Sequence, residues 1–421
     1  MIRIGTPFIT QEGGRAYLKA KVTITEDTAA AYVKNITPRR SFCVWLTDED
    51  YPPASWDSDG TLWFDVPLEY SRYLCTERSN SFVIALLWYA IVSGSDIEFE
   101  SPMSKRLYDG ITTMLMPELA KAGFAPVALV GPVTNEPVWC EGGVVAGMSG
   151  GVDSTYTLKC YTSDSVPEDI RLTHLCHYTC GYLFKPGEVG RGVDALYDSE
   201  DKIEDIVLDR ARQVAQAKGL PLVDSNSNID RDFYRGGYIY MGMYRYLAST
   251  LALEHLYKLY ISSSSGHVND QVEVSLFAPT QHYEGLLCSS LQTETFRYMS
   301  SDNDSRIRKL KAVADDEVFQ KTASVCFATG PNGENCGECY GCWKTMVPLD
   351  VIGKLDKFDS IFDLDKYYAN REEIFRDLIT FARRPEASSA RETVKQVMDE
   401  IDAGNSGKAG ELFKKVYEAE S

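Results

Sequence analysis

The chain lacks a long hydrophobic run. Its longest apolar stretch, residues 82–92 of 421, is about half of what a helix needs to cross a bilayer. We therefore expect this stretch to form a buried core helix. The opening residues, MIRIG, also lack the charged-then-apolar layout of a secretory signal peptide. Together these absences predict a cytoplasmic protein with no membrane partner.

An excess of basic residues is absent too. The chain has 61 Asp and Glu against 43 Lys and Arg, a formal net charge of −18. This balance argues against a large basic face that follows a nucleic-acid backbone, although a local basic patch is compatible with it. The hydrophobic fraction of 44% and the charged fraction of 25% are those of a globular protein, and the length suits two or three domains.

The sequence contains no internal repeat or low-complexity tract, so we divide it into domains where its hydrophobic pattern changes. Residues 1–140 combine a strand-like alternation at 17–24 with a later helical pattern that Pro102 and Pro117 are expected to interrupt. We interpret them as an N-terminal α+β domain. Residues 346–421 are helical and charged, and are expected to serve packing or the formation of a homo-oligomer.

Residues 141–325 alternate short apolar segments with helical ones, which predicts an α/β domain with a mostly parallel sheet. The expected strands are residues 143–148, 169–174, 220–224 and 259–263. The expected helices open at residue 154 and cover residues 202–218 and 241–256.

A glycine-rich loop follows the first of these strands. Its members are Ser149, Gly150, Gly151, Val152, Asp153 and Ser154. Adjacent glycines let the backbone approach an anion, and the start of the following helix favours the negative charge of a pyrophosphate. The serines can add hydroxyl donors, whereas Asp153 suits Mg²⁺ or a helix cap. The loop is neither a Walker A motif nor a dinucleotide fingerprint. A plain helix-starting turn is the structural alternative.

Four cysteines are clustered in the pattern CX9CX2CX2C. They are Cys326, Cys336, Cys339 and Cys342. This spacing suits four thiolates around a tetrahedral Zn²⁺, with Gly337 and Gly341 easing the turns. An iron–sulfur cluster and a redox dithiol are the alternatives. A closed four-thiolate site has no open coordination position, so we assign the segment 326–345 to a zinc loop that supports folding.

The SGGVDS loop resembles the signature of the N-type ATP-pyrophosphatase, or PP-loop, superfamily. The resemblance implies a doubly wound, Rossmann-like α/β sheet of the adenine nucleotide alpha hydrolase type. It also implies binding of ATP and Mg²⁺ and cleavage of ATP to AMP and pyrophosphate. The cysteine segment in addition resembles the zinc loop of the 7-cyano-7-deazaguanine synthase family of queuosine biosynthesis. That family uses ATP and ammonia, and the resemblance covers roughly residues 143–345.

Several other residues are candidates for the same site. His177, with His174 before it, follows the strand expected at 169–174. Arg306 and Lys309 are three residues apart, so on a helix they share a face and could neutralise phosphate charge. Two further segments resemble parts of PP-loop active sites, and their candidates are Arg235, Gly266, His267 and Asp270. For each, a solvated or interior side chain is the alternative.

The expected activity is that of an ATP-dependent carbon–nitrogen ligase. It would adenylate a carboxylate, for example on a deazapurine-like acid, release pyrophosphate, and release AMP on attack by ammonia or an amine. One alternative is a sulfur transferase acting on tRNA or a small molecule, with Cys176, Cys180 or Cys288 as the reactive thiol. The other is a non-catalytic nucleotide-binding subunit of a larger assembly.

Overall fold

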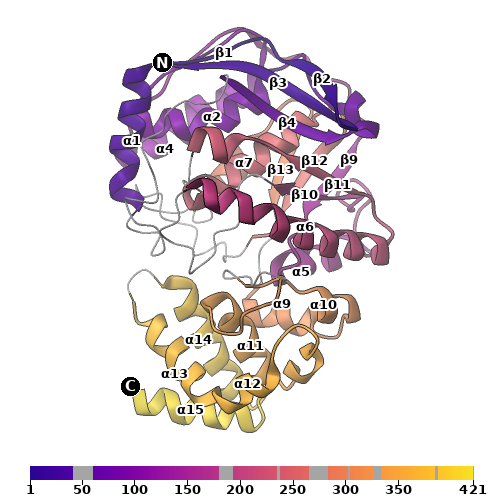
Figure 1. Cartoon of the computed structure of the whole chain (residues 1–421), viewed down its shortest axis with the longest axis vertical. Coiled ribbons are helices and arrows are strands. Elements are labelled where there is room, and N and C mark those ends of the chain that lie inside the picture. Colours follow the sequence, from indigo (N-terminus) through magenta and orange to yellow (C-terminus); the bar gives the residue numbers. More distant parts are fainter. Residues whose placement is uncertain are drawn as a thin grey trace.

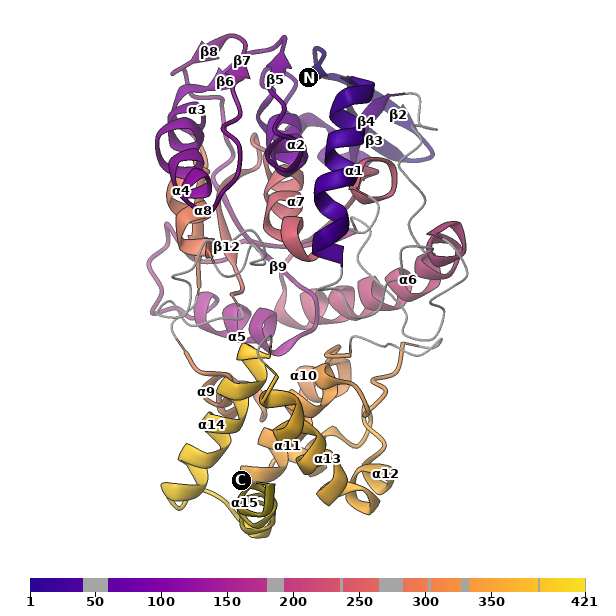
Figure 2. The same cartoon turned by 90° about the vertical axis from the view of Figure 1, so that its left-hand side faces the viewer.

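The computed structural model describes all of the chain except residues 41–59, 180–192, 235–237, 265–282, 302–303, 327–332, 385–386 and 421. It is a mixed α/β structure built as a stack. The N-terminal part lies at one end, a parallel sheet lies in the middle and a helical C-terminal part lies at the other end (Figures 1 and 2). Among the described residues, no helix is long and apolar enough to span a membrane.

The central sheet has five strands, all paired in parallel, in the order β11-β10-β9-β12-β13. The strands are β9 (Gly143–Gly147), β10 (His174–Thr179), β11 (Leu222–Asn226), β12 (Tyr257–Ser262) and β13 (Arg297–Ser300). Three of the expected strands are confirmed, but the one expected at residues 169–174 is wrong. Pro167 begins a turn in which its carbonyl accepts the Ile170 N–H, so the strand starts only at His174.

Helices cover both faces of this sheet. Alternate residues of β9 point to opposite faces, and each set packs against different helices. Val144 and Ala146 share a cluster with Leu158 and Val214, which lie on α5 (Val152–Tyr161) and α6 (Val193–Lys218). Val145 faces the other way, into the cluster that contains much of α7 (Tyr238–Ala252).

The N-terminal part contains a second, mixed sheet. Its order is β2-β3-β1-β5-β7, with β4 paired to β3. The strands are β1 (Ile2–Ile4), β2 (Phe8–Glu12), β3 (Arg15–Ile24), β4 (Thr61–Pro67), β5 (Ile97–Phe99) and β7 (Leu129–Val130). Gly13 and Gly14, at φ of 58° and 81°, form the turn between β2 and β3, which needs residues that tolerate positive φ. The short strands β6 (Met103–Ser104) and β8 (Val133–Thr134) pair separately.

Helix α2 (Asn80–Ser93) is the centre of this part, and all of its residues are buried. The expectation of a core helix is therefore confirmed. It packs on α7, where the Trp88 and Tyr244 rings are stacked with centroids 6.2 Å apart. Helix α1 (Glu26–Arg40) lies beside α2 (Figure 2).

A continuous helical segment follows β6. It consists of α3 (Lys105–Asp109), the π-helical turn η2 (Gly110–Leu115) and α4 (Met116–Lys121). The expectation that Pro117 interrupts the helix is wrong. The Met116 N–H donates to the Ile111 carbonyl five residues back, and Pro117 then falls in the first turn of α4, where a missing N–H is tolerated.

Polar contacts join the N-terminal part to the edge of the parallel sheet. Arg15 contacts Asp65 on β4 (Nε–Oδ2, 2.6 Å) and Asp224 on β11 (NH1–Oδ2, 2.8 Å). The Asn226 N–H donates to Asp65 Oδ1 at 2.6 Å. Because α2 and the α7 face of the parallel sheet also share one hydrophobic core, these parts pack as one body. The division at residue 140 stays a prediction.

The C-terminal part is helical and has its own core. After α8 (Glu284–Ser290), its helices are α9 (Arg306–Val313), α10 (Glu317–Thr322), α11 (Tyr340–Val351), α12 (Leu364–Ala369), α13 (Arg371–Ala382), α14 (Ser388–Asp402) and α15 (Lys408–Glu420). This core includes Phe319, Met346 and Phe413, together with Val152 from α5. Val152 thus links the glycine-rich loop to the C-terminal helices.

Replacing Asp65 tests the junction with the N-terminal part. Asp65→Ala leaves Arg15 and the Asn226 N–H without their acceptor, and the Asp65 side chain is only 6% exposed. We expect a loss of roughly 2–4 kcal/mol in the free energy of unfolding, measured by chemical denaturation. Arg3→Ala, which breaks the exposed Arg3–Glu98 pair, is the control and is expected to lose less than about 1 kcal/mol. Equal losses would contradict the prediction.

Candidate functional site

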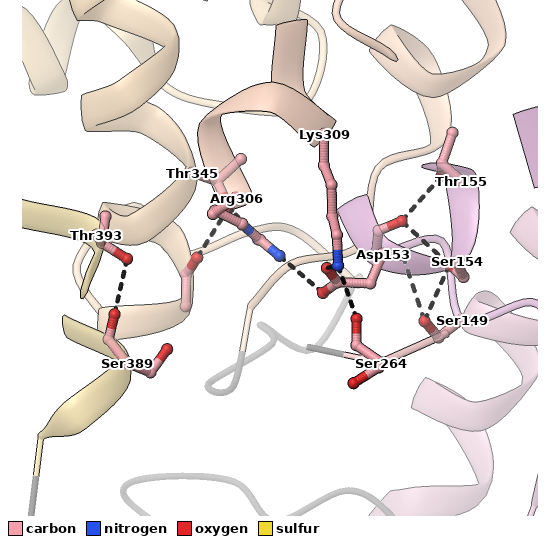
Figure 3. Close-up of polar contacts among 12 residues, drawn as sticks. Ser149, Asp153, Ser154, Thr155, Ser264, Arg306, Lys309, Thr345, Ser389 and Thr393 are labelled. Atoms are coloured by element: carbon pink, nitrogen blue, oxygen red, sulfur yellow. Dashed lines mark hydrogen bonds and ion pairs between the residues drawn. The ribbon is translucent and has the colours of Figure 1, made fainter. Parts of the chain in front are cut away.

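The glycine-rich loop lies at a point where the parallel sheet reverses its direction of growth. The chain proceeds from β9 to β10 and β11 on one side, and then crosses to β12 and β13 on the other. In open parallel sheets, ligands bind beyond the carboxyl ends of the strands at such a switch point. The loop after β9 and Ser264 after β12 both lie there (Figure 3).

The loop needs glycine at position 150. Gly150 has φ of +73°, and its carbonyl accepts the Ser324 N–H at 2.9 Å. A Cβ atom at this position would lie 3.2 Å from Ser324 Cβ and 3.3 Å from the Thr322 carbonyl oxygen. Both the backbone conformation and the close approach of residues 322–324 therefore disfavour a side chain here.

Hydroxyl groups gather at the start of α5. Ser149 Oγ lies 3.3 Å from Ser154 Oγ, while Ser154 and Thr155 donate to the Gly151 carbonyl at 3.0 and 2.9 Å. The backbone N–H groups and the dipole of a helix N-terminus favour an anion at this place. The Val152 side chain instead points into the C-terminal core and is 1% exposed, so only its backbone faces the loop.

Asp153 is held by two cations from α9. Arg306 NH1 lies 2.8 Å from Asp153 Oδ2, and Lys309 Nζ lies 3.1 Å from Oδ1 (Figure 3). Lys309 also donates to the Ser264 carbonyl at 2.8 Å, and Arg306 donates to Thr345 Oγ1 at 3.1 Å. The expectation that Arg306 and Lys309 share one helical face is confirmed, and that face is turned toward the loop.

The electrostatics of the site follow from this arrangement. Burial acts to raise the pKa of Asp153, but the positive charges of Arg306, Lys309 and Lys344 outweigh it and hold that pKa below its ordinary value. Lys344 lies on α11, where burial and the charge of Arg306 lower its pKa to about 8. Sequence reasoning missed Lys344. The available signal was its place two residues after the last clustered cysteine.

Of the two histidines on β10, His174 is the first residue of the strand and His177 lies in its second half. His177 Nδ1 donates to the Met148 carbonyl at 3.2 Å, and the Met148 N–H donates to the Cys176 carbonyl at 2.8 Å. Burial lowers the pKa of His177, which fits a neutral ring that supports the residue before Ser149. His174 begins the strand and packs against Tyr257, away from the loop.

Four predicted site residues fall outside the described part of the chain. They are Arg235, Gly266, His267 and Asp270. The site built from described residues therefore consists of the loop, Ser264, α9 and the start of α11.

The four clustered cysteines are brought together. The Sγ–Sγ distances are 3.7 Å for Cys326–Cys339, 3.7 Å for Cys339–Cys342 and 4.0 Å for Cys336–Cys342. A tetrahedral Zn²⁺ with Zn–S bonds of about 2.3 Å has Sγ–Sγ edges of about 3.8 Å. The Cys339 N–H donates to Cys336 Sγ at 3.3 Å, an arrangement that supports a thiolate. The cluster could therefore hold a metal such as zinc.

The cysteine cluster directly follows the segment that contacts the loop. Cys326 comes two residues after Ser324, whose N–H binds the Gly150 carbonyl. Buried Asn335 fixes this segment by accepting the Val325 N–H at 3.0 Å and donating to the Ala323 carbonyl at 2.9 Å. The cysteine segment thus adjoins and supports residues 322–324, which contact Gly150.

A scan of family models and searches of curated proteins and of solved structures give no significant match to this chain.

Substitution of Gly150 tests the shape of the loop. Gly150→Ala adds the contact with Ser324 to the roughly 1–2 kcal/mol that a left-handed backbone costs a non-glycine residue. Gly142→Ala is the matched control, since Gly142 has φ of +87° but nothing within 4 Å of an added Cβ. We expect Gly150→Ala to lower the free energy of unfolding more than Gly142→Ala does. An equal effect would mean that residues 322–324 do not constrain the loop.

Removing one clustered thiolate tests the link between metal and loop. Cys339→Ser is expected to lose one equivalent of zinc in elemental analysis and to speed the hydrogen exchange of amides in residues 148–154, because the segment beside Gly150 loses its anchor. Cys160→Ser, which removes a thiol outside the cluster, is expected to change neither. Unchanged zinc content in Cys339→Ser would contradict the assignment.

Proposed function

We propose that the chain is an ATP-dependent carbon–nitrogen ligase that adenylates a substrate carboxylate and then transfers the acyl group to ammonia or an amine. The observation that carries the proposal is the SGGVDS loop, which forms a left-handed glycine turn at the switch point of a parallel sheet and faces cations from α9 and α11. The structural alternative, a plain helix-starting turn, explains a cation beside Asp153 but not an excess of three cations over one carboxylate.

The sheet supports this reading. Helices cover both faces, and the strand order changes direction between β9 and β12. We interpret this as a doubly wound sheet of the adenine nucleotide alpha hydrolase type. ATP would then lie across the carboxyl ends of β9 and β12, with its phosphates at Ser149, Gly150, Gly151 and Ser154.

The balance of charge in the crevice suits a polyphosphate. Three cationic side chains, Arg306, Lys309 and Lys344, act on the single carboxylate of Asp153. The excess of positive charge can meet the phosphates and can stabilise departing pyrophosphate more than bound substrate. Mg²⁺, when bound with ATP, would add charge neutralisation, and Asp153 would have to exchange its contact with Arg306 or Lys309 to become a ligand of that ion.

The proposed chemistry has two steps. A carboxylate oxygen of the substrate attacks the α-phosphorus of ATP, the α–β bridging bond breaks, and pyrophosphate leaves. The nitrogen of ammonia or an amine then attacks the acyl carbon, the acyl–phosphate bond breaks, AMP leaves and the nitrogen loses a proton. The residues of this chain contribute by orienting the reactants and by compensating charge.

Nitrogen chemistry is favoured over sulfur transfer by the burial of two candidate thiols. Cys176 is 1% exposed in the middle of β10, and burial raises the pKa of Cys288 far above its ordinary value. A reactive thiolate needs the opposite environment. The third candidate, Cys180, lies outside the described residues.

The product of ATP cleavage tests the proposal directly. Purified protein with ATP, Mg²⁺, ammonia and candidate acids, including a carboxy-deazaguanine, is expected to form AMP and pyrophosphate in equal amounts. Formation of ADP would contradict the proposal. Binding of ATP without AMP formation under any of these conditions would favour the non-catalytic subunit. Loss of AMP formation in Cys176→Ser or Cys288→Ser would favour the sulfur transferase.

Two neighbouring positions on α9 give a matched pair of variants. Lys309→Ala removes a buried cation that reaches both Asp153 and Ser264, and we expect the rate of AMP formation to fall roughly 100-fold. Arg308→Ala removes a cation whose side chain is 75% exposed on the other side of the helix, and its rate is expected to stay close to that of the unmodified chain. Similar rates for the two variants would contradict a role for Lys309 at the phosphates.

A further inference from the structure

A second group of metal-ligating side chains lies at the amino end of the parallel sheet, opposite the phosphate loop. Cys75 and Glu77 belong to the segment between η1 (Leu68–Tyr73) and α2, and His255 lies between α7 and β12. One ligand atom of each lies within 4.8 Å of the other two. The His255 carbonyl accepts the Glu141 N–H at 2.8 Å, which places the group beside the start of β9.

The imidazole of His255 is fixed in the orientation that metal-binding histidines adopt. Its Nδ1 lies 2.9 Å from the Trp139 carbonyl, to which the protonated nitrogen donates. The ring also stacks on Trp139, with centroids 4.5 Å apart and planes 7° apart. A backbone carbonyl on Nδ1 selects the tautomer in which the Nε2 lone pair is available to a metal.

That lone pair points at an acceptor. His255 Nε2 lies 3.0 Å from Glu77 Oε2, and Cys75 Sγ lies 3.7 Å from the same oxygen. One nitrogen, one oxygen and one sulfur atom thus lie close enough together to surround a single cation. A tetrahedral Zn²⁺ with ordinary bond lengths separates N from O by about 3.3 Å and S from O by about 3.5 Å. The N–O and S–O distances here are therefore each within about 0.3 Å of those around a bound Zn²⁺.

We propose that Cys75, Glu77 and His255 form a second metal site, which binds Zn²⁺ through one sulfur, one oxygen and one nitrogen atom. Zinc is the metal that this mixed set of donors suits best. Water completes the tetrahedron on the solvent side, where the Glu77 side chain is 51% exposed.

The thiol of Cys75 is enclosed by protein. The residue is 2% exposed, and burial together with the charges of Glu254 and Glu77 raises the pKa of its thiol well above the ordinary value. A bound Zn²⁺ reverses this balance by replacing the thiol proton. Glu254 itself bonds to Asn80 (2.9 Å) and Thr293 (2.5 Å), so its oxygens are already occupied and it is not one of the proposed ligands.

The site connects separate segments of the molecule. Cys75 and Glu77 come from the N-terminal part, and His255 comes from the turn that leads into β12 of the parallel sheet. A metal bound here stabilises the folded chain, because the unfolded chain does not bring these ligands together. This role is independent of the ligase chemistry and of the four-cysteine cluster.

Zinc stoichiometry tests the proposal on the full chain. After chelation and titration with Zn²⁺ alone, the unmodified chain is expected to bind one equivalent more than the four-cysteine cluster holds. Glu77→Gln, at a half-exposed position that should not affect folding, is expected to weaken the additional site roughly tenfold or more. Glu69→Gln, an exposed carboxylate on η1 outside the cluster, is the control and is expected to retain both equivalents.

Cobalt substitution and thermal melting complete the test. Co²⁺ at the additional site is expected to give a visible spectrum with one thiolate ligand, which Glu77→Gln loses while it keeps the four-thiolate spectrum. Zn²⁺ is expected to raise the melting temperature of the unmodified chain more than that of Glu77→Gln. A single equivalent in the unmodified chain, with both variants identical to it, would overturn the proposal in favour of a His255–Glu77 ion pair. AMP formation by Glu77→Gln is expected to be unchanged, so this test can fail without affecting the ligase proposal.

Discussion

The carboxylate of Asp153 determines how the middle and the C-terminal part of the molecule fit together. A carboxylate enclosed by protein is strongly unfavourable unless cations compensate it. Arg306 and Lys309 do so here at 2.8 and 3.1 Å, which requires α9 to lie across the first turn of α5. Val152, one residue earlier, extends into the C-terminal core. Val152 and Asp153 therefore both shape the loop and attach the helical part to the sheet.

The features that could be predicted from sequence are local ones. The SGGVDS string, the three-residue spacing of Arg306 and Lys309 and the cysteine pattern each carry their geometry within a few residues. The parallel character of the central sheet also followed from the alternation of its segments. The start of β10 could not be predicted from this alternation. Ile170, which lies in the expected strand, instead belongs to the turn that begins at Pro167.

Contacts between distant segments could not be predicted in this way. Lys344 acts on Asp153 from α11, a helix that begins within the cysteine cluster and far along the chain from the loop. Glu77 and His255 are 178 residues apart, and packing of α2 on α7 brings their segments together. Neither Glu77 nor His255 lies in a pattern that a single sequence reveals. At both ends of the parallel sheet, side chains of the proposed sites thus come from elements outside the sheet.

Helix α2 has a consequence for how the chain can be divided. All residues of α2 are buried, and α2 in turn covers a face of α7. Without residues 1–140, the face of α7 that carries Tyr244 and Leu247 would become a contiguous apolar surface. Surfaces of this kind drive self-association. A polypeptide that begins at the first strand of the parallel sheet would therefore aggregate. It would do so even though it contains the whole glycine-rich loop and all four clustered cysteines.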